Sequence, residues 1–399
     1  MPFVPRESSV REARRHLRGR SRSHRRRLAG PAPVLRVADV ALFYGERSGG
    51  IRTYVDAKAA WARETGAIDH HVIVPGRRVR HEQGRHELRS LRLAATNGYR
   101  LPLGAGALKA TLHALRPDVV LLHDPFWRPL GVTQAAHALG AQVVAVHHGS
   151  IALDAAGLPG PDRLWHPLLR SWMHHTYRDA DAVMSAVDTE SDCGRPAMLP
   201  LRFGVHPAFR PQPGVERGDH VLYVGRLGRE KGVIELLHAA ARSSRPWKLV
   251  LIGRGPLEER VLALAARLRI ADRIELRPFI SDREQLARAY AAARVVVMPG
   301  AHETFGLVGF EAAASGAAVV TCSTAPSAAH MRGIVRTYEP GDVGGLLAAI
   351  EHARASDPSP LAAAALALRS RWGAAFAAET AALERLAGPG RNALTGAPG

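Results

Sequence analysis

Short apolar runs alternate with helical stretches along most of this chain, and that alternation limits its possible folds more than any other feature. In the first half the helical stretches include Thr53–Glu64 and Ala105–Leu115. The apolar runs between them are Val34–Phe43, His71–Val74, Val119–Leu122, Val143–Val146 and Ala182–Ala186. Runs without polar alternation are typical of strands that are covered on both faces. The pattern therefore predicts an α/β fold with a parallel, doubly wound sheet.

The alternation stops in a proline-rich segment from Pro200 to Gly214 and then starts again. Helical stretches now include Pro256–Leu268 and Asp282–Ala292. The second set of apolar runs is Val221–Val224, Lys248–Ile252, Arg273–Leu276, Val295–Met298 and Ala318–Thr321. We expect two Rossmann-like lobes joined by one hinge, with a ligand in the cleft between them at the carboxyl ends of the strands.

These patterns divide the chain into five segments. They are a basic leader (1–30), an N-terminal domain (31–203), a linker (204–215), a C-terminal domain (216–357), and C-terminal helices with a tail (358–399). Within the last segment Leu361–Leu386 is rich in alanine and is predicted to be helical, with Trp372 and Phe376 one turn apart. The leader lacks apolar periodicity, which favours a disordered tail, although a tether to anionic lipid is the functional alternative.

Composition excludes several classes of protein. Hydrophobic residues make up 46% of the 399 residues and charged residues 23%, which is enough to build a packed core. No apolar stretch approaches the ~18–20 residues of a membrane span. Two cysteines, Cys193 and Cys322, cannot build a disulfide framework, so we expect a reducing compartment and a cytoplasmic protein, with contact to the inner face of a membrane left open.

The chain is strongly basic. Lys and Arg total 54 against 36 Asp and Glu, which gives a net charge of +18, and the leader alone holds ten arginines against Glu7 and Glu12. Such a charge attracts phosphate in nucleic acid, in anionic lipid or in a phosphorylated small molecule. Composition does not distinguish these partners.

Two glycine turns follow consecutive strands of the second half. Gly225 to Gly232 opens a helix, and its Arg226 and Lys231 add positive charge to backbone N–H groups that favour an anion. The spacing matches neither a P-loop nor a dinucleotide fingerprint, so an ordinary turn is the alternative. Gly253 and Gly255 form the second turn, for which tight packing is the simpler explanation.

The segment from Pro299 to Glu311 carries the strongest chemical pattern. Glu303 is expected on a loop, where its carboxylate can accept hydrogen bonds from sugar hydroxyls, and Glu311 on a helix, within reach of a ribose diol. Backbone N–H groups of Thr304, Phe305, Gly306 and Leu307 would face a bound anion. The alternatives are a solvated Glu303, a capping Glu311, or the carboxylate pair of a glycoside hydrolase.

The first half offers partners for this site. Gly49 and Gly50 precede a helix and permit close approach to a phosphate or a sugar. His147, or His148 one residue further, ends a strand and can face the reacting centre, and His123–Asp124 is a weaker candidate. A satisfied polar residue at a strand end is the alternative for each.

Three patterns are set aside or left open. Asp179 and Asp181 resemble a metal-binding pair but fit a helix end and turn, so no metal site is predicted. The stretch Arg163–Arg178 fits a core helix with one exposed face better than a membrane-surface helix. The basic stretch Arg77–Arg92 is expected to be loop-like and is another candidate for lipid contact.

With these motifs together, the chain from about Val34 to Glu351 resembles the GT-B glycosyltransferases of family 4. The resemblance rests on Gly49–Gly50, the Gly225–Gly232 turn, the Gly253–Gly255 turn and the Glu303/Glu311 pair. The start of the first domain and the block from Pro299 to Gly306 are similar to actinobacterial phosphatidylinositol-mannoside α-mannosyltransferases.

The resemblance implies roles for these residues. Arg226 and Lys231 would hold the donor diphosphate and stabilise the leaving group, which a metal does in other transferases. Glu303 would bind the donor sugar, Glu311 the ribose, and His147 would lie beside the anomeric centre, with His148 as the register alternative. Gly49, Gly50, Gly253, Gly255 and the residues from Thr304 to Leu307 would contribute to donor binding. No cofactor and no metal are expected.

The predicted function is that of a retaining hexosyltransferase that moves a sugar, with mannose from GDP-mannose as the candidate, to a lipid-linked or polyol acceptor. Departures from the family pattern at His206 and at Ser323–Pro326 leave the identity of the sugar open. The alternatives are a nucleotide-sugar epimerase or hydrolase on the same fold, and a non-enzymatic binder of phosphate or nucleic acid. Nucleic acid is not an expected partner, because no nucleic-acid-binding module is visible.

Overall fold

The computed structural model describes residues 34–42, 44, 49–92, 100–102, 104–123, 131–149, 151, 155, 160–186 and 197–388. Residues 1–34 and 35–399 form separate units, and both sheets of the fold belong to the second unit. The prediction of a disordered leader, the tail after residue 388, and Asp124 lie outside the described residues.

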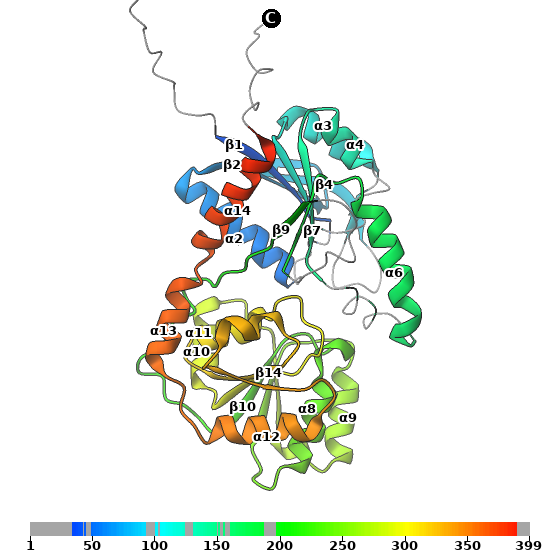
Figure 1. Cartoon of the computed structure of the whole chain (residues 1–399). Coiled ribbons are helices and arrows are strands. Elements are labelled where there is room, and N and C mark those ends of the chain that lie inside the picture. The colour runs from blue at the N-terminus through cyan, green and yellow to red at the C-terminus, as the bar shows by residue number, and fades with distance from the viewer. Residues whose placement is uncertain are drawn as a thin grey trace, which may run out of the picture. The chain divides into compact units, whose positions relative to one another are not determined.

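The first lobe is built on a nine-stranded sheet with the order β3-β4-β2-β1-β6-β7-β8-β9, and β5 pairs with β4 (Figure 1). Its strands are β1 (Leu35–Val40), β2 (Ile68–Gly76), β3 (Arg80–Glu82), β4 (Arg85–Arg92), β5 (Arg100–Pro102), β6 (Val119–Leu122), β7 (Gln142–His147), β8 (Ala182–Ser185) and β9 (Ala197–Pro200). The five strands predicted for this half all form, and they pair in parallel. Their valine-rich runs are buried on both faces, as the absence of polar alternation predicted.

Helices cover both faces of this sheet. They are α2 (Gly50–Thr65), α3 (Ala105–Leu115), α4 (Val132–His137) and α6 (Asp162–Tyr177). Alternate strand residues enter different cores: Val144 and Val146 pack on the side of α2, whereas Val143 and Ala145 pack on the side of α3, α4 and α6. A shift of one residue along β7 therefore moves a side chain from one layer to the other.

The second lobe is built on a six-stranded parallel sheet with the order β12-β11-β10-β13-β14-β15. Its strands are β10 (His220–Val224), β11 (Lys248–Ile252), β12 (Ile274–Arg277), β13 (Val295–Met298), β14 (Ala318–Cys322) and β15 (Val335–Tyr338). The chain leaves β10 first towards β12 and then returns to β13 on the other side. In open α/β sheets the ligand binds at such a switch point, outside the carboxyl ends of the strands.

The helices of this lobe also form two layers. The core that holds Val233, Val261 and Leu346 belongs to α8 (Val233–Arg242), α9 (Glu258–Arg267) and α12 (Val343–Arg354). On the other face lie α10 (Arg283–Ala292) and α11 (Leu307–Ala314). Side-chain caps fix two starts, because Asp282 accepts hydrogen bonds from N–H groups of α10 and Asp342 accepts one from α12.

The predicted helix over Leu361–Leu386 is in fact two helices, α13 (Pro360–Arg369) and α14 (Trp372–Ala387). At the break between them, the linker residue Val205 donates a backbone hydrogen bond of 2.7 Å to the carbonyl oxygen of Ser370. α13 packs on α11 of the second lobe, and α14 packs on α2 of the first lobe (Figure 1). Trp372 and Phe376 stack with ring centroids 5.1 Å apart, so the predicted one-turn pair is present.

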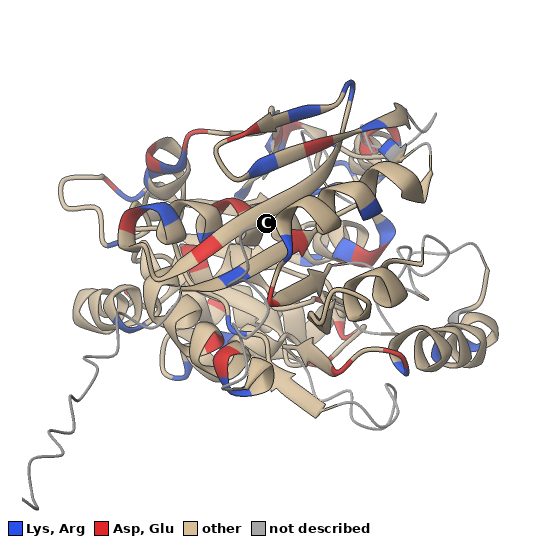
Figure 2. Cartoon of the chain, turned by 90° about the horizontal axis from the view of Figure 1, so that it is seen from above, with Lys and Arg blue, Asp and Glu red and all other residues tan. Residues whose placement is uncertain are grey.

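The prediction of a loop-like segment over Arg77–Arg92 was wrong, because this stretch forms β3 and β4. Its only fully buried hydrophobic side chain among the described residues is Leu88, and most of the other positions are charged or polar. Figure 2 shows Lys and Arg interleaved with Asp and Glu along the elements of the described chain. No helix among the described residues is long and apolar enough to cross a membrane.

Candidate functional site

Three loops at the carboxyl ends of β10, β11 and β13 form the centre of the candidate site. These strands are neighbours, so the Gly225–Gly232, Gly253–Gly255 and Pro299–Gly306 segments emerge side by side. The first two loops are joined by a backbone hydrogen bond of 3.0 Å from Leu227 to Arg254. Strand order alone therefore brings together the motifs that the sequence analysis singled out.

Close backbone packing explains the glycines of these loops. A Cβ atom at Gly253 would lie 2.1 Å from the carbonyl oxygen of Gly225, and one at Gly232 would lie 2.3 Å from that of Pro299. Gly232 also has a φ of 67°, in the left-handed region that favours glycine. The tight-turn explanation thus accounts for Gly253, and Gly255 packs in the same way against Leu227.

Two ion pairs hold the cationic side chains of the site. Lys231 Nζ lies 2.8 Å from Glu303 Oε2, and these two side chains are 27% and 10% exposed. Arg226 donates a hydrogen bond of 2.5 Å to Glu230, whose side chain is 9% exposed. The structure therefore brings the predicted Lys231 and Glu303 into contact. It also adds Glu230, a counter-ion that the sequence analysis did not identify, although it lies four residues after Arg226 on the same turn.

The segment from Thr304 to Gly306 leads into α11, which begins at Leu307, within the range predicted for the start of this helix. Gly306 precedes the helix with a φ of 91° and no side chain caps the helix, so the N-terminus can receive an anion. The Phe305 ring is buried and stacks on Phe203 at 4.8 Å between centroids. Phe305 can therefore offer a ligand its backbone, while its side chain belongs to the core.

Glu311 lies in the second turn of α11, with its carboxylate 3.4 Å from the hydroxyl of Tyr290. Burial raises the pKa of Glu311 to about 7, against the opposing effects of Arg283 and of the Tyr290 hydroxyl. The carboxylate of Glu311 therefore gains or loses its proton near neutral pH. Its charge state changes how it forms hydrogen bonds to a ligand.

The first lobe contributes the start of α2. A Cβ atom at Gly50 would lie 3.9 Å from Cδ1 of Leu307, so the N-termini of α2 and α11 approach each other. Neither Gly49 nor Gly306 provides a side-chain cap for the helix that follows it. The N-termini of α2 and α11, where backbone N–H groups lack acceptors within the helix, thus lie close together.

His147, the last residue of β7, and His148, which directly follows the strand, point to different layers. His147 is 4% exposed, lies 5.8 Å from the ring of Tyr177 in α6, and has no hydrogen-bond partner among the described residues at either ring nitrogen. His148 lies 5.7 Å from the ring of Tyr54 in α2 and 6.5 Å from Phe203, on the side where Phe203 meets Phe305. His147 therefore faces the layer of α6, and the register alternative His148 faces the side of Phe203 and Phe305; which of the two lies beside the reacting centre stays a prediction.

A buried polar network behind His148 was missed by the sequence analysis. His123 Nδ1 lies 2.7 Å from His148 Nε2, and His123 Nε2 lies 3.6 Å from Asp39 Oδ1. Asp39 also contacts Lys58 at 3.1 Å and His70 at 2.9 Å. Of this network the sequence analysis had named only His123 and His148; a further signal was the charged Asp39 within an apolar strand.

Asp181, one of the two aspartates set aside in the sequence analysis, has a structural role. Asp181 accepts hydrogen bonds from the backbone of Val143 at 2.7 Å and from His137 at 2.9 Å, as a turn residue does. Within the described ranges no three His, Cys, Asp or Glu side chains are grouped so that they could hold a metal ion.

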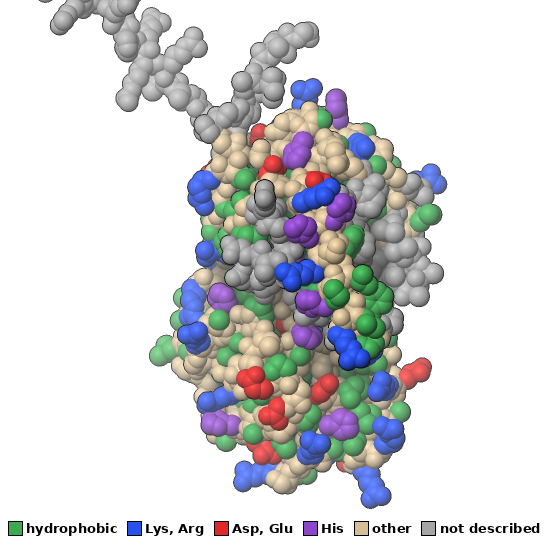
Figure 3. All heavy atoms as spheres, turned by 45° about the vertical axis from the view of Figure 1, so that its right-hand side comes forward, with side chains coloured by type: hydrophobic (Ala, Val, Ile, Leu, Met, Phe, Trp, Pro, Cys, Tyr) green, Lys and Arg blue, Asp and Glu red, His purple; other side chains and the backbone are tan. Residues whose placement is uncertain are grey.

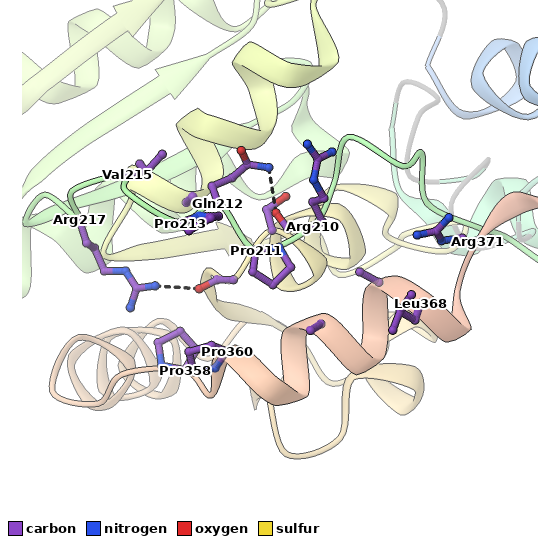
Figure 4. A pocket seen from close by; sticks show the side chains of 15 residues that line it. Arg210, Pro211, Gln212, Pro213, Val215, Arg217, Pro358, Pro360, Leu368 and Arg371 are labelled. Carbon is purple, nitrogen blue, oxygen red and sulfur yellow. Dashed lines mark hydrogen bonds between the residues drawn. The ribbon is translucent and has the colours of Figure 1, made fainter.

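One cavity lies away from the three loops described above, and a second cavity borders them. A cavity of about 670 Å³ lies between the linker and α13, and its lining includes Arg217, Gln212 and Leu368 (Figure 4). None of the predicted site residues lines it. A cavity of about 300 Å³ includes Glu230, Pro299 and His302, and so borders the first and third loops.

Two family models match the chain. The model described as Glycosyltransferase Family 4 matches residues 48–188, and the model described as Glycosyl transferases group 1 matches residues 207–341. The two matches fall on the two sheets in turn.

Curated relatives are similar over most of the chain. A GDP-mannose-dependent alpha-(1-6)-phosphatidylinositol dimannoside mannosyltransferase of Mycobacterium tuberculosis strain H37Ra is 32% identical over 315 residues, which are 73% of this chain and 80% of the relative. A D-inositol 3-phosphate glycosyltransferase of Mycolicibacterium vanbaalenii is 34% identical over 302 residues, which are 66% of this chain and 65% of the relative. Nothing in these comparisons favours an epimerase, a hydrolase or a non-enzymatic binder.

Solved structures share the fold. Sucrose-phosphate synthase from Thermosynechococcus elongatus superposes with a TM-score of 0.66 at 21% identity, covering 88% of this chain and 96% of that one. Anabaena HepE in complex with UDP and glucose superposes with a TM-score of 0.64 at 16% identity, covering 87% and 99%. At these identities the likeness establishes the architecture of the two lobes.

Proposed function

This chain belongs to the GT-B glycosyltransferases of family 4 and is a sugar-transferring enzyme, and from that premise we propose that it moves mannose from GDP-mannose to a phosphatidylinositol mannoside with retention of configuration. The observation that carries the proposal is the contact of Lys231 with Glu303 at the switch point of the second sheet. The relative named as a GDP-mannose-dependent phosphatidylinositol dimannoside mannosyltransferase supports the donor and the acceptor.

In this proposal Arg226 and Lys231 bind the diphosphate of the donor. In the structure Arg226 is paired with Glu230 and Lys231 with Glu303, so each cation exchanges a carboxylate for phosphate oxygens when the donor binds. Both cations then stabilise the charge that develops on the departing GDP, which is the contribution a metal makes in other transferases. The reaction is proposed to need no metal ion.

The carboxylates of the site bind hydroxyl groups. Glu303, released from Lys231, accepts hydrogen bonds from the transferred sugar, and Glu311 accepts them from the ribose of the nucleotide. The N-termini of α2 and α11 supply backbone N–H groups, since Gly50 and Leu307 lie on facing segments. His148 takes the place beside the anomeric carbon that the sequence analysis gave first to His147.

We also propose that α6 contacts an anionic lipid surface, which gives the enzyme access to its lipid acceptor. Leu164, Leu168 and Trp172 follow one another at four-residue spacing and are 60%, 63% and 37% exposed. Exposed basic side chains at Arg163 and Arg170 flank them, while the last turn of the helix buries Met173 and Tyr177 in the core. Figure 3 turns this side of the molecule forward and shows hydrophobic side chains gathered beside Lys, Arg and His. Apolar anchors with a basic border are typical of membrane-surface helices.

A donor and acceptor panel tests the proposed function. The purified enzyme is incubated with GDP-mannose, GDP-glucose, UDP-glucose or UDP-galactose, each with and without phosphatidylinositol dimannoside in mixed vesicles. We expect GDP release and a mannosylated lipid only where GDP-mannose and the acceptor are both present, with no loss of rate in EDTA. Release of GDP without an acceptor at the full rate would indicate a hydrolase, and preference for another donor would refute the assignment of the sugar.

A further inference from the structure

The imidazole of His148 is held by a second histidine rather than by the backbone. His123, which directly follows β6, places its Nδ1 2.7 Å from Nε2 of His148, and the two rings are stacked with centroids 5.0 Å apart. A hydrogen bond between two imidazoles requires one ring to donate and the other to accept. The tautomer of His123 therefore determines the tautomer of His148.

The other nitrogen of His123 faces a carboxylate. Its Nε2 lies 3.6 Å from Oδ1 of Asp39, a completely buried residue in the middle of the sheet. Burial by itself would raise the pKa of Asp39, but Lys58 and His70 hold that pKa well below its usual value, so the group is ionised. An anion beside Nε2 favours a proton on that nitrogen and leaves Nδ1 as the acceptor.

Asp39 is itself fixed from several sides. Its Oδ1 contacts Lys58 Nζ at 3.1 Å, and its Oδ2 contacts His70 Nε2 at 2.9 Å. Lys58 in turn contacts Glu379 of α14 at 2.6 Å. All of these side chains are at most 4% exposed, so water does not compete for the contacts.

We propose that Asp39 and His123 are positioning residues which set the ring orientation and the tautomer of His148, keeping a proton on Nε2 and an accepting lone pair on Nδ1. This inference rests on the proposed function, in which His148 lies beside the transferred sugar. A neutral ring with an accepting Nδ1 can receive a hydrogen bond from a sugar hydroxyl.

The charge state of His148 agrees with that role. Burial lowers the pKa of His148 well below its ordinary value, and His123 and His147 lower it further, against the opposing effect of Asp39. Among the described residues, the titratable groups of the surrounding elements that join this network are Tyr54 and Lys58 of α2, His70 of β2 and Glu379 of α14. The ring is neutral across the physiological range, so its function depends on which nitrogen carries the proton.

A nitrogen-15 NMR measurement tests the tautomer without any activity assay. In the full-length protein labelled at histidine, the His148 signals are identified by their loss in His148→Gln. We expect His148 in the wild type to carry its proton on Nε2, and we expect that preference to weaken in Asp39→Asn. A proton on Nδ1 in the wild type would overturn the proposal, whatever the enzyme is found to transfer.

Kinetics provide the second arm. His123→Phe removes the partner of His148, whereas His123→Asn keeps a polar atom near the position of Nδ1. We expect His123→Phe to lower kcat by about 10–100-fold, the usual effect of removing a second-layer partner of a functional histidine. The KM for the donor should change little, and His123→Asn should recover most of the lost rate. Equal rates in His123→Phe and the wild type would refute the positioning role.

A matched control uses a histidine pair outside the network. His86 Nε2 lies 3.1 Å from His71 Nδ1 in the β2–β4 region, and His86→Phe removes a histidine–histidine contact of the same kind. This variant should keep the wild-type kcat. If the wild type transfers no sugar, the proposed function fails while the NMR arm still decides the tautomer. If the wild type transfers sugar and His123→Phe does too, only this inference fails.

Discussion

The ammonium group of Lys58 lies 2.6 Å from the carboxylate of Glu379, and both side chains are buried. The hydroxyl of Tyr54 also donates a hydrogen bond to Glu379. These contacts join α2, at the start of the first lobe, to α14, the last described helix. The ring centroids of Trp372 and Phe376 lie 6.0 and 5.5 Å from that of Tyr54, so both rings pack against the Tyr54 ring. The first lobe is therefore completed by a helix that follows the whole second lobe in sequence.

Replacing Lys58 with methionine should destabilise the fold strongly. The variant keeps most of the side-chain volume but leaves Asp39 and Glu379 as buried carboxylates without their cation. Loss of one partner of a buried pair costs about 3–5 kcal/mol, and we expect urea unfolding to show a loss of that size. Arg254→Met, which removes an exposed pair with Glu258, should cost only about 0–1 kcal/mol. Equal stability of the two variants would contradict the structural role of Lys58.

Lys231→Ala and Glu303→Ala should each abolish most sugar transfer while the protein stays folded. Lys231 stabilises the departing diphosphate and Glu303 binds the sugar, and loss of one such electrostatic contact costs about 10²–10³ in kcat. Circular dichroism checks the fold and a GDP-release assay checks the rate. Near-normal turnover in both variants would refute the assignment of the site.

Donor binding should depend on pH through Glu311. Burial raises its pKa to about 7, so the carboxylate is mostly protonated at pH 6 and mostly ionised at pH 8. The ionised form accepts hydrogen bonds from both hydroxyls of a ribose, and one such titration allows about a tenfold rise in GDP affinity between these values. The raised pKa also means that the contribution of Glu311 to stability falls as the pH rises from its ordinary pKa towards 7.

Calorimetric titration with GDP at pH 6 and pH 8 checks this expectation. In Glu311→Gln, the pH dependence of GDP affinity that arises from the carboxylate should be lost. The part that arises from the phosphates of GDP should remain. An identical pH dependence in Glu311→Gln and the wild type would show that Glu311 does not titrate in contact with the nucleotide.

Gly232→Ala should disturb the site more than an alanine at another left-handed glycine. At Gly232 the new Cβ atom would meet the carbonyl oxygen of Pro299 at 2.3 Å, in addition to the strain of a φ of 67°. At Gly66 the φ is 62° but no atom lies within 4 Å, so Gly66→Ala suffers only backbone strain of about 1–2 kcal/mol. We expect a larger fall in melting temperature and in GDP affinity for Gly232→Ala. A larger fall for Gly66→Ala would contradict the close packing of the first and third loops.

Charges on the exposed face of α6 should weaken membrane binding. We expect Leu164→Glu combined with Leu168→Glu to reduce cosedimentation with phosphatidylinositol-containing vesicles and to leave GDP binding intact. Leu262→Glu provides the control, because Leu262 is 48% exposed on α9, a helix of the second lobe. Wild-type vesicle binding by the double variant would exclude α6 as the docking helix.

Apolar runs predicted the centre of both sheets because each run is covered on both faces. Val119–Leu122, Lys248–Ile252 and Val295–Met298 form strands with the predicted limits. The strands that were missed include β3 at the edge of the sheet, its neighbour β4, in which charged residues alternate with others, and β15, where Arg336 and Thr337 are exposed. Edge strands of this kind lack the apolar content by which a buried strand is identified from sequence. The domain limits between the lobes stay predictions.

The sequence predicts the parts of the site that strand order brings together. It does not predict the parts that depend on how side chains pack. Glycine turns after neighbouring parallel strands had to lie together, which is why Lys231 and Glu303 meet. The choice between His147 and His148 depended on which layer each faces, and an error of one residue at a strand end reverses that choice. The pairing of Tyr54 with Glu379 joins residues 325 positions apart, and no local pattern indicates such a contact.

The return of α14 to the first lobe has a consequence for synthesis on the ribosome. Tyr54 leaves the ribosome long before Glu379, because 325 positions separate the two residues. Throughout that interval the nascent first lobe exposes the apolar surface that Trp372 and Phe376 later cover, and Lys58 has only one of its two carboxylates. The second lobe can therefore assemble before the first lobe is complete, and a chain stalled ahead of α14 presents that uncovered surface to chaperones.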